Sequence, residues 1–142
     1  MKSSDDRIDW RLPALFLVIA AAALTAAVLI GISDNPPGLA LLYLASASFV
    51  LTFAHRWRSA KSFVILLVVS LLGFPVAVLA HNLLEPVGEI LGHIAGVKAV
   101  SQFGSVAAFF IAILFCPVGV LIGAAGSLIA WGLGRRALKA NR

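Results

Sequence analysis

Charged residues are few in this sequence: Asp, Glu, Lys and Arg make up 12% of its 142 residues, whereas 61% of the residues are hydrophobic. Soluble domains average about a quarter charged residues. The few charges flank four apolar runs, each of roughly twenty residues, the length that a helix needs to cross about 30 Å of hydrocarbon. The composition therefore excludes an ordinary soluble domain and predicts an all-α integral membrane protein.

Cysteine is also rare: Cys116 is the single cysteine in the sequence. One cysteine excludes an intramolecular disulfide and a redox mechanism that uses a pair of thiols. Cys116 stands in an apolar run just before Pro117. We expect it to be a small buried packing residue.

Asp, Glu, Lys, Arg and His are missing from the central parts of all four apolar runs. Such residues at membrane depth are typical of proton relays and ion-coupled transporters. The sequence also lacks a phosphate-binding glycine loop, a GxSxG motif and an HExxH motif. We therefore expect no enzymatic activity and no cofactor.

The basic residues that are present lie almost entirely on one side of the apolar runs. Lys98 is the exception among the 11 Lys and Arg residues. The others are Lys2, Arg7, Arg11, Arg56, Arg58, Lys61, Arg135, Arg136, Lys139 and Arg142. Short loops rich in Lys and Arg stay in the cytoplasm, so this pattern predicts a multi-pass protein of the cell inner membrane with both termini cytoplasmic. We interpret the net charge of +5 as topogenic and expect no nucleic-acid partner.

Four spans follow from the apolar runs, over residues 12–33, 39–56, 62–84 and 103–133. Trp10, Trp57 and Trp131 all fall at expected cytoplasmic interfaces, where indole rings are enriched. The first run is longer than a signal-peptide core, so we expect a span; cleavage would leave three spans with the same loop orientation. We predict one domain over residues 1–142, a transmembrane four-helix bundle of two helical hairpins.

Small residues recur at spacings of three and four along the last span. They are Ala112, Cys116, Gly119, Gly123, Gly126 and Ala130. Such a stripe lets two helix backbones approach closely in a membrane. We expect an internal helix contact, with contact to another copy of the chain as the alternative.

Residues 81–97 carry the most unusual pattern. His81, Glu85, Glu89 and His93 recur every four residues and share one helical face with glycines at positions 88, 92 and 96. Pro86 removes a helical hydrogen bond and clashes with the preceding turn. We therefore expect the third span to end near Glu85 and a short amphipathic helix to lie at the membrane interface over residues 86–96.

Three interpretations of this segment stay open. The first is a solvated interfacial helix, and the second is a packing surface formed by Gly88, Gly92 and Gly96. The third is a site for a divalent metal or cationic solute. The metal-site residues would be His81, Glu85, Glu89 and His93, with Asp34 from the other outer turn. Imidazole and carboxylate groups suit zinc or manganese.

The functional expectation is a small polytopic membrane protein that acts as a scaffold, assembly factor or accessory subunit. Its partners would be the lipid bilayer and another membrane protein or a second copy of itself. The alternative is a transporter or binding protein for a divalent metal or cationic solute. Transport needs a polar path into the membrane, for which Tyr43, Ser46 and Ser70 are the candidates.

Overall fold

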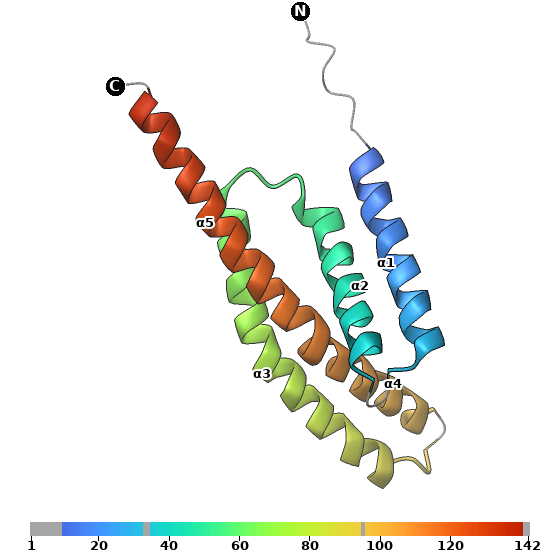
Figure 1. The fold of residues 1–142 in the computed structure, drawn as a ribbon. Helices are drawn as coiled ribbons and strands as arrows, with labels where there is room; N and C mark the ends of the chain where they lie inside the picture. Colours follow the sequence, from blue (N-terminus) through green and yellow to red (C-terminus); the bar gives the residue numbers. More distant parts are fainter. Residues whose placement is uncertain (1–9, 33–34, 95, 141–142) are drawn as a thin grey trace, which may run out of the picture. The chain divides into compact units, whose positions relative to one another are not determined.

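The computed structural model describes residues 10–32, 35–94 and 96–140, without the side chains of 135–140. Over these ranges the chain is mainly helical and has no strand. The elements are α1 (Arg11–Ile30), α2 (Pro36–Ala54), α3 (Ala60–Ile90), α4 (Val97–Phe110), the π-helical segment η1 (Ile111–Phe115) and α5 (Cys116–Ala140), as Figure 1 shows.

Four of the described helical stretches are long and apolar enough to cross a membrane: α1, α2, α3 and the continuous stretch α4–η1–α5. Many large apolar side chains on them are exposed, such as Leu29 at 81% and Phe103 at 79%. Exposed apolar surface of this extent is unfavourable in water and normal in contact with lipid. The expected all-helical class with four membrane-length apolar helices is confirmed.

The chain divides into two compact units, Met1–Trp57 and Arg58–Arg142. In the first unit α1 packs along α2 through small residues, among them the fully buried Ala27 and the nearly buried Ala23 and Ala45. Gly38 lies directly against the carbonyl oxygen of Gly31, so that a side chain at position 38 would collide with the backbone. Close backbone approach through small residues is the usual way in which membrane helices associate.

The first turn of α2 includes residues that the sequence pattern placed in the preceding loop. The helix begins at Pro36, with Pro36 and Pro37 at its first two positions, rather than at residue 39. Proline suits these positions, because the first backbone N–H groups of a helix have no partner within the helix.

The predicted break at Pro86 is wrong. Helix α3 runs through both Pro75 and Pro86 and ends at Ile90, so residues 86–90 belong to α3 rather than to a separate interfacial helix. Contacts with α4 hold the helix on both sides of Pro86: Leu84 lies next to Gly104, and Gly88 lies next to Ser101. Tertiary packing of this kind outweighs the local cost of the missing hydrogen bond in apolar helices.

A short turn follows α3 and leads directly into α4. Gly96 caps the start of α4 with a left-handed φ of 83°, a conformation that glycine adopts without steric cost. The last apolar stretch therefore begins at residue 97, six residues earlier than the sequence indicates.

A π-helical segment separates α4 from α5. The backbone N–H of Cys116 bonds to the carbonyl oxygen of Ile111, five residues earlier, and Pro117 follows at once. A π turn holds one residue more than an α turn and shifts the helix face. The π turn therefore changes the register within a continuous helical stretch.

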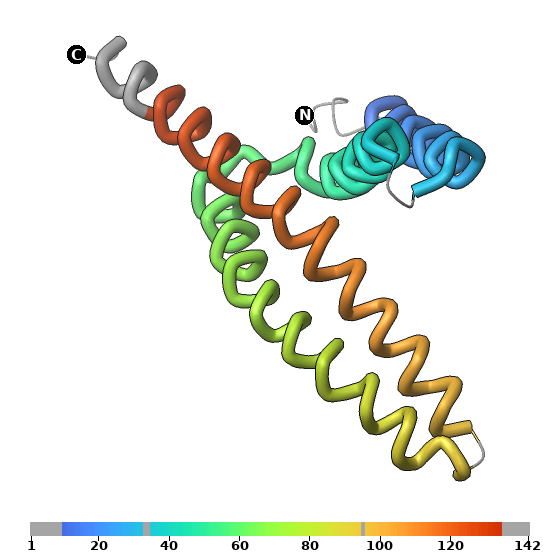
Figure 2. The backbone as a smooth tube through the Cα atoms, turned by 60° about the horizontal axis from the view of Figure 1, so that its bottom comes forward, coloured from blue at the N-terminus to red at the C-terminus, as the bar shows by residue number. Residues whose placement is uncertain are grey.

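Helix α3 packs against α4 and α5 along its length, and Figure 2 shows the two helical stretches side by side. The neighbouring positions are Phe63 and Gly126, Leu67 and Gly123, Ser70 and Gly119, Gly73 and Cys116, Leu84 and Gly104, and Gly88 and Ser101. Residue numbers fall along α3 as they rise along α4–η1–α5, so the two stretches are antiparallel. The small-residue stripe of the last span faces α3, within the same unit.

Candidate functional site

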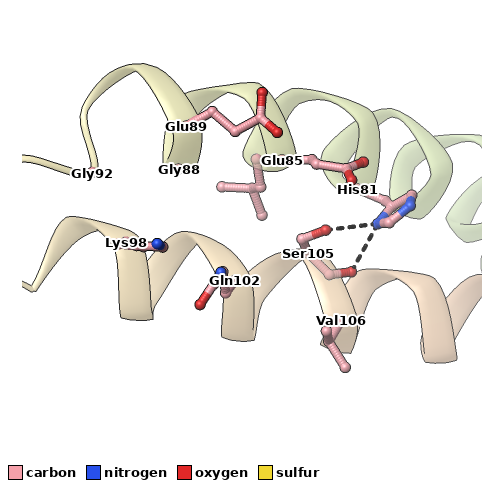
Figure 3. A pocket seen from close by; sticks show the side chains of 10 residues that line it. His81, Glu85, Gly88, Glu89, Gly92, Lys98, Gln102, Ser105 and Val106 are labelled. Atoms are coloured by element: carbon pink, nitrogen blue, oxygen red, sulfur yellow. Dashed lines mark hydrogen bonds between the residues drawn. The ribbon is translucent and has the colours of Figure 1, made fainter.

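A polar cleft of about 620 Å³ opens between the last turns of α3 and the first turns of α4 (Figure 3). Its volume lies in the range of small-ligand sites. Helix α3 contributes His81, Leu84, Glu85, Gly88 and Glu89, helix α4 contributes Lys98, Gln102, Ser105 and Val106, and Gly92 belongs to the turn between them. All of these residues lie within the second unit.

His81 and Ser105 tie the two helices together at the inner end of the cleft. His81 Nδ1 lies 2.8 Å from the Ser105 hydroxyl oxygen and 3.1 Å from the Ser105 carbonyl oxygen. A protonated Nδ1 donates to the carbonyl oxygen, and an unprotonated Nδ1 accepts from the hydroxyl. The imidazole also packs against the Phe109 ring, with 5.4 Å between ring centroids. Both contacts fix the orientation of His81.

Charged groups of both signs line the rest of the cleft. Glu85 and Glu89 project from α3, and Lys98 and Gln102 lie on the facing helix α4. Among the residues drawn in Figure 3, the hydrogen bonds are those between His81 and Ser105. The two carboxylates and the one ammonium group give the cleft a net negative charge with a local positive site.

Gly88 allows the two walls of the cleft to approach. It is buried, and a Cβ atom at this position would lie 3.0 Å from Ser101 Cβ on α4. Gly92 follows in the turn, where a Cβ atom would collide with the Gly88 carbonyl oxygen. Gly96 has nothing within 4 Å of an added Cβ atom. The expected packing stripe over Gly88, Gly92 and Gly96 is therefore not one helical face, because α3 ends before the second of these glycines.

The structure assembles part of the predicted ligand set. His81, Glu85 and Glu89 all line the cleft, whereas His93 lies in the turn after α3 and is not among the lining residues. Asp34 lies outside the described residues. In the part of the chain that the structure describes, no three His, Cys, Asp or Glu side chains are grouped closely enough to hold a metal ion.

Sequence reasoning missed the contribution of α4 to this cleft. Lys98, Gln102 and Ser105 lie beyond the amphipathic segment, and helical periodicity identifies only residues that share the face of one helix. A usable signal existed: small residues at 101, 105 and 108 extend the stripe of the last span towards the N-terminus at spacings of three and four. Ser101, Ser105 and Ala108 are indeed buried.

A second hollow, of about 360 Å³, lies between the middle of α3 and the start of α5. Its lining is apolar apart from Ser70 and Cys116, and it includes Leu71, Phe74, Pro117, Val120 and Leu121. Cys116 is buried, as its position in the apolar run predicts. This hollow offers no charged group for recognition.

The candidates for a polar path are engaged in local structure. The Ser46 hydroxyl donates to the Leu42 carbonyl oxygen of its own helix at 2.9 Å. Ser70 is buried, and its side chain lies directly against Gly119 of α5. Tyr43 is 38% exposed on α2. The Ser46 hydroxyl therefore bonds within its own helix, whereas the Ser70 side chain belongs to the contact between α3 and α5.

Comparison with protein-family models, with curated proteins and with solved structures finds no match for this chain.

Proposed function

We propose that the chain spans the cell inner membrane four times, through α1, α2, α3 and α4–η1–α5, as two helical hairpins of one bundle. The placement of Lys and Arg supports cytoplasmic termini. The turns around residues 31–35 and 91–96 would then lie on the outer side. Every described span carries exposed apolar side chains, which supports the proposal that these helices lie in the membrane.

Within that membrane we propose a non-enzymatic role as a scaffold, assembly factor or accessory subunit. The observation that carries the proposal is that polar side chains within the proposed spans make contacts within or between helices. Ser46 and Thr52 donate to carbonyl oxygens of their own helix, and Ser70 packs against the glycine stripe of α5. Side chains of this kind stabilise helices and their contacts without offering a proton or ion a route.

The alternative, a transporter or binding protein for a divalent metal or cationic solute, draws its support from Glu85 and Glu89 in the cleft. Two findings count against it. The described residues contain no three-residue metal cluster, and the hollow next along α3 is apolar. A carboxylate cleft without a polar continuation favours binding at the membrane surface over transport.

The deciding experiment measures assembly and flux with the same purified full-length chain. Isolation in mild detergent, followed by mass measurement of the intact particle, should give a defined complex with one partner protein or a second copy at fixed stoichiometry. Reconstituted vesicles should show no uptake of Mn²⁺ or Zn²⁺ above protein-free vesicles.

The control is the Glu85→Gln/Glu89→Gln variant, which removes the carboxylates of the cleft and leaves the apolar surfaces unchanged. Metal uptake by the wild-type chain that this variant abolishes would contradict the scaffold proposal and establish the alternative. A strictly monomeric particle without a partner would also contradict it.

A further inference from the structure

We propose that the cleft between α3 and α4 binds the headgroup of a phospholipid that carries both a phosphate and a primary ammonium group. The ammonium would lie against Glu85 and Glu89, and the phosphate against Lys98. This inference rests on the proposed membrane placement and goes beyond the scaffold role.

The first argument is the arrangement of charge. Carboxylates from α3 and an ammonium group from α4 face one cleft of about 620 Å³. Within the described structure no ion pair connects Lys98 to either carboxylate, so both signs of charge are available to a ligand. A bare cation would meet the repulsion of Lys98, and a bare phosphate the repulsion of two carboxylates. A zwitterion complements both.

The second argument is hydrogen-bonding capacity. A primary ammonium has three N–H donors, and each carboxylate accepts at two oxygens. Glu85 and Glu89 stand one helical turn apart on α3, so together they can surround one ammonium group. Hydrogen bonds between charged partners of this kind are among the strongest in proteins. Gln102 adds an amide beside the position of the phosphate.

The third argument is the surroundings of the cleft. It lies where α3 ends and α4 begins, and these parts of the two helices carry exposed apolar side chains, including Ile90 at 71% and Val100 at 72%. In a membrane these positions belong to the boundary between headgroups and acyl chains. A lipid can therefore place its charged end in the cleft and its chains along the helices, which a soluble zwitterion cannot do.

The metal hypothesis for Glu85 and Glu89 is geometrically weaker than this one. Zinc needs four ligands at about 2.0–2.3 Å, and the described residues do not provide even three grouped ligands. An ammonium group binds carboxylates at longer distances and with less strict geometry than a metal ion does. Exposed glutamates on one helix can meet this requirement.

The test is native mass spectrometry of the detergent-solubilised full chain, titrated with three lipids that share the same dioleoyl chains. Phosphatidylethanolamine has the phosphate and the primary ammonium, phosphatidylcholine has a quaternary ammonium without N–H donors, and phosphatidylglycerol lacks the cation. We expect phosphatidylethanolamine to bind about tenfold more tightly than either of the others.

Two variants locate the selectivity. Glu85→Gln/Glu89→Gln should remove the preference for phosphatidylethanolamine over phosphatidylcholine, and Lys98→Gln should weaken both lipids equally. Lys61→Gln is the matched control, because Lys61 is exposed at the other end of α3, about 36 Å along the helix from Glu85; it should bind like the wild type. Circular dichroism checks that every variant is folded.

Equal binding of the three lipids, or a preference that survives Glu85→Gln/Glu89→Gln, would overturn the proposal. Soluble glycerophosphoethanolamine that binds as tightly as the lipid would overturn the lipid assignment, since the acyl chains would then contribute nothing. These outcomes are independent of the partner and flux measurements, so a failure here is distinguishable from a failure of the scaffold proposal.

Discussion

At the scale of single residues, the contact between α3 and α5 depends on glycine, which has no side chain. Gly119, Gly123 and Gly126 face Ser70, Leu67 and Phe63, and each position lacks room for a Cβ atom. In a membrane, where lipid is as apolar as leucine, such close packing replaces the hydrophobic effect as the force between helices. Glycine therefore stabilises this pair, although it weakens each isolated helix.

Substitution of Gly123 by alanine should destabilise the protein by about 1–3 kcal/mol, the usual cost of overpacking. The added Cβ would lie 2.7 Å from the Leu67 backbone nitrogen, which cannot move without shifting α3. The control Gly132→Ala lies on the same helix with nothing within 4 Å, and should stabilise by up to about 1 kcal/mol through helix propensity. Unfolding in detergent, followed by circular dichroism, measures both; equal stabilities of the two variants would contradict the close contact.

Removal of the Ser105 hydroxyl should weaken the contact between α3 and α4 at the inner end of the cleft. Ser105→Ala deletes the 2.8 Å partner of His81 Nδ1 and should cost about 1 kcal/mol, with a change in the nitrogen chemical shift of the His81 imidazole. Ser127→Ala is the matched control, because that hydroxyl donates to Ala124 of its own helix. An unchanged imidazole shift in Ser105→Ala would show that the pair does not form.

At the scale of elements, the four apolar runs predict the four long helices, because the length and the composition of a run indicate whether a helix can span a membrane. The pattern did not predict how helices end. The sequence pattern predicts that the second span begins at residue 39 and that the third ends near Glu85, yet Pro36 starts α2 and Pro86 lies inside α3. Position within the helix and contacts with a neighbour decide the effect of a proline. The cleft was half predicted, because the sequence periodicity finds residues on one helix, whereas Lys98 and Gln102 come from a second helix.

The antiparallel register of α3 and α5 is open to a cross-linking test. A cysteine introduced at Gly73 would place its Cβ 3.6 Å from the Cys116 sulfur, so mild oxidation should form an intramolecular disulfide. Loss of maleimide-reactive thiols in the denatured monomer measures it. Val76→Cys is the control, because Val76 is exposed on α3 and should leave both thiols free. Free thiols in oxidised Gly73→Cys would contradict the register.

At the scale of the whole molecule, the distribution of basic residues predicts how the chain is oriented. Lys98 is the exception to that distribution, and it lines the polar cleft at the start of α4. A single lysine on the proposed outer side is compatible with this orientation, because orientation follows the local excess of Lys and Arg rather than each single charge. In the proposed headgroup site, Lys98 would contribute to lipid binding rather than to orientation.

The proposed orientation makes a direct prediction for reporter fusions to the full chain. A reporter that is active only in the cytoplasm should be active after Arg142, and one that is active only outside should be active when inserted near Ala99. The physical reason is that moving Arg56, Arg58 and Lys61 across the membrane is costlier than moving Lys98 alone. Replacing the three by Gln should weaken this bias and yield mixed orientations, whereas Lys98→Gln should leave the wild-type pattern. An external signal after Arg142 in the unaltered chain would contradict the topology.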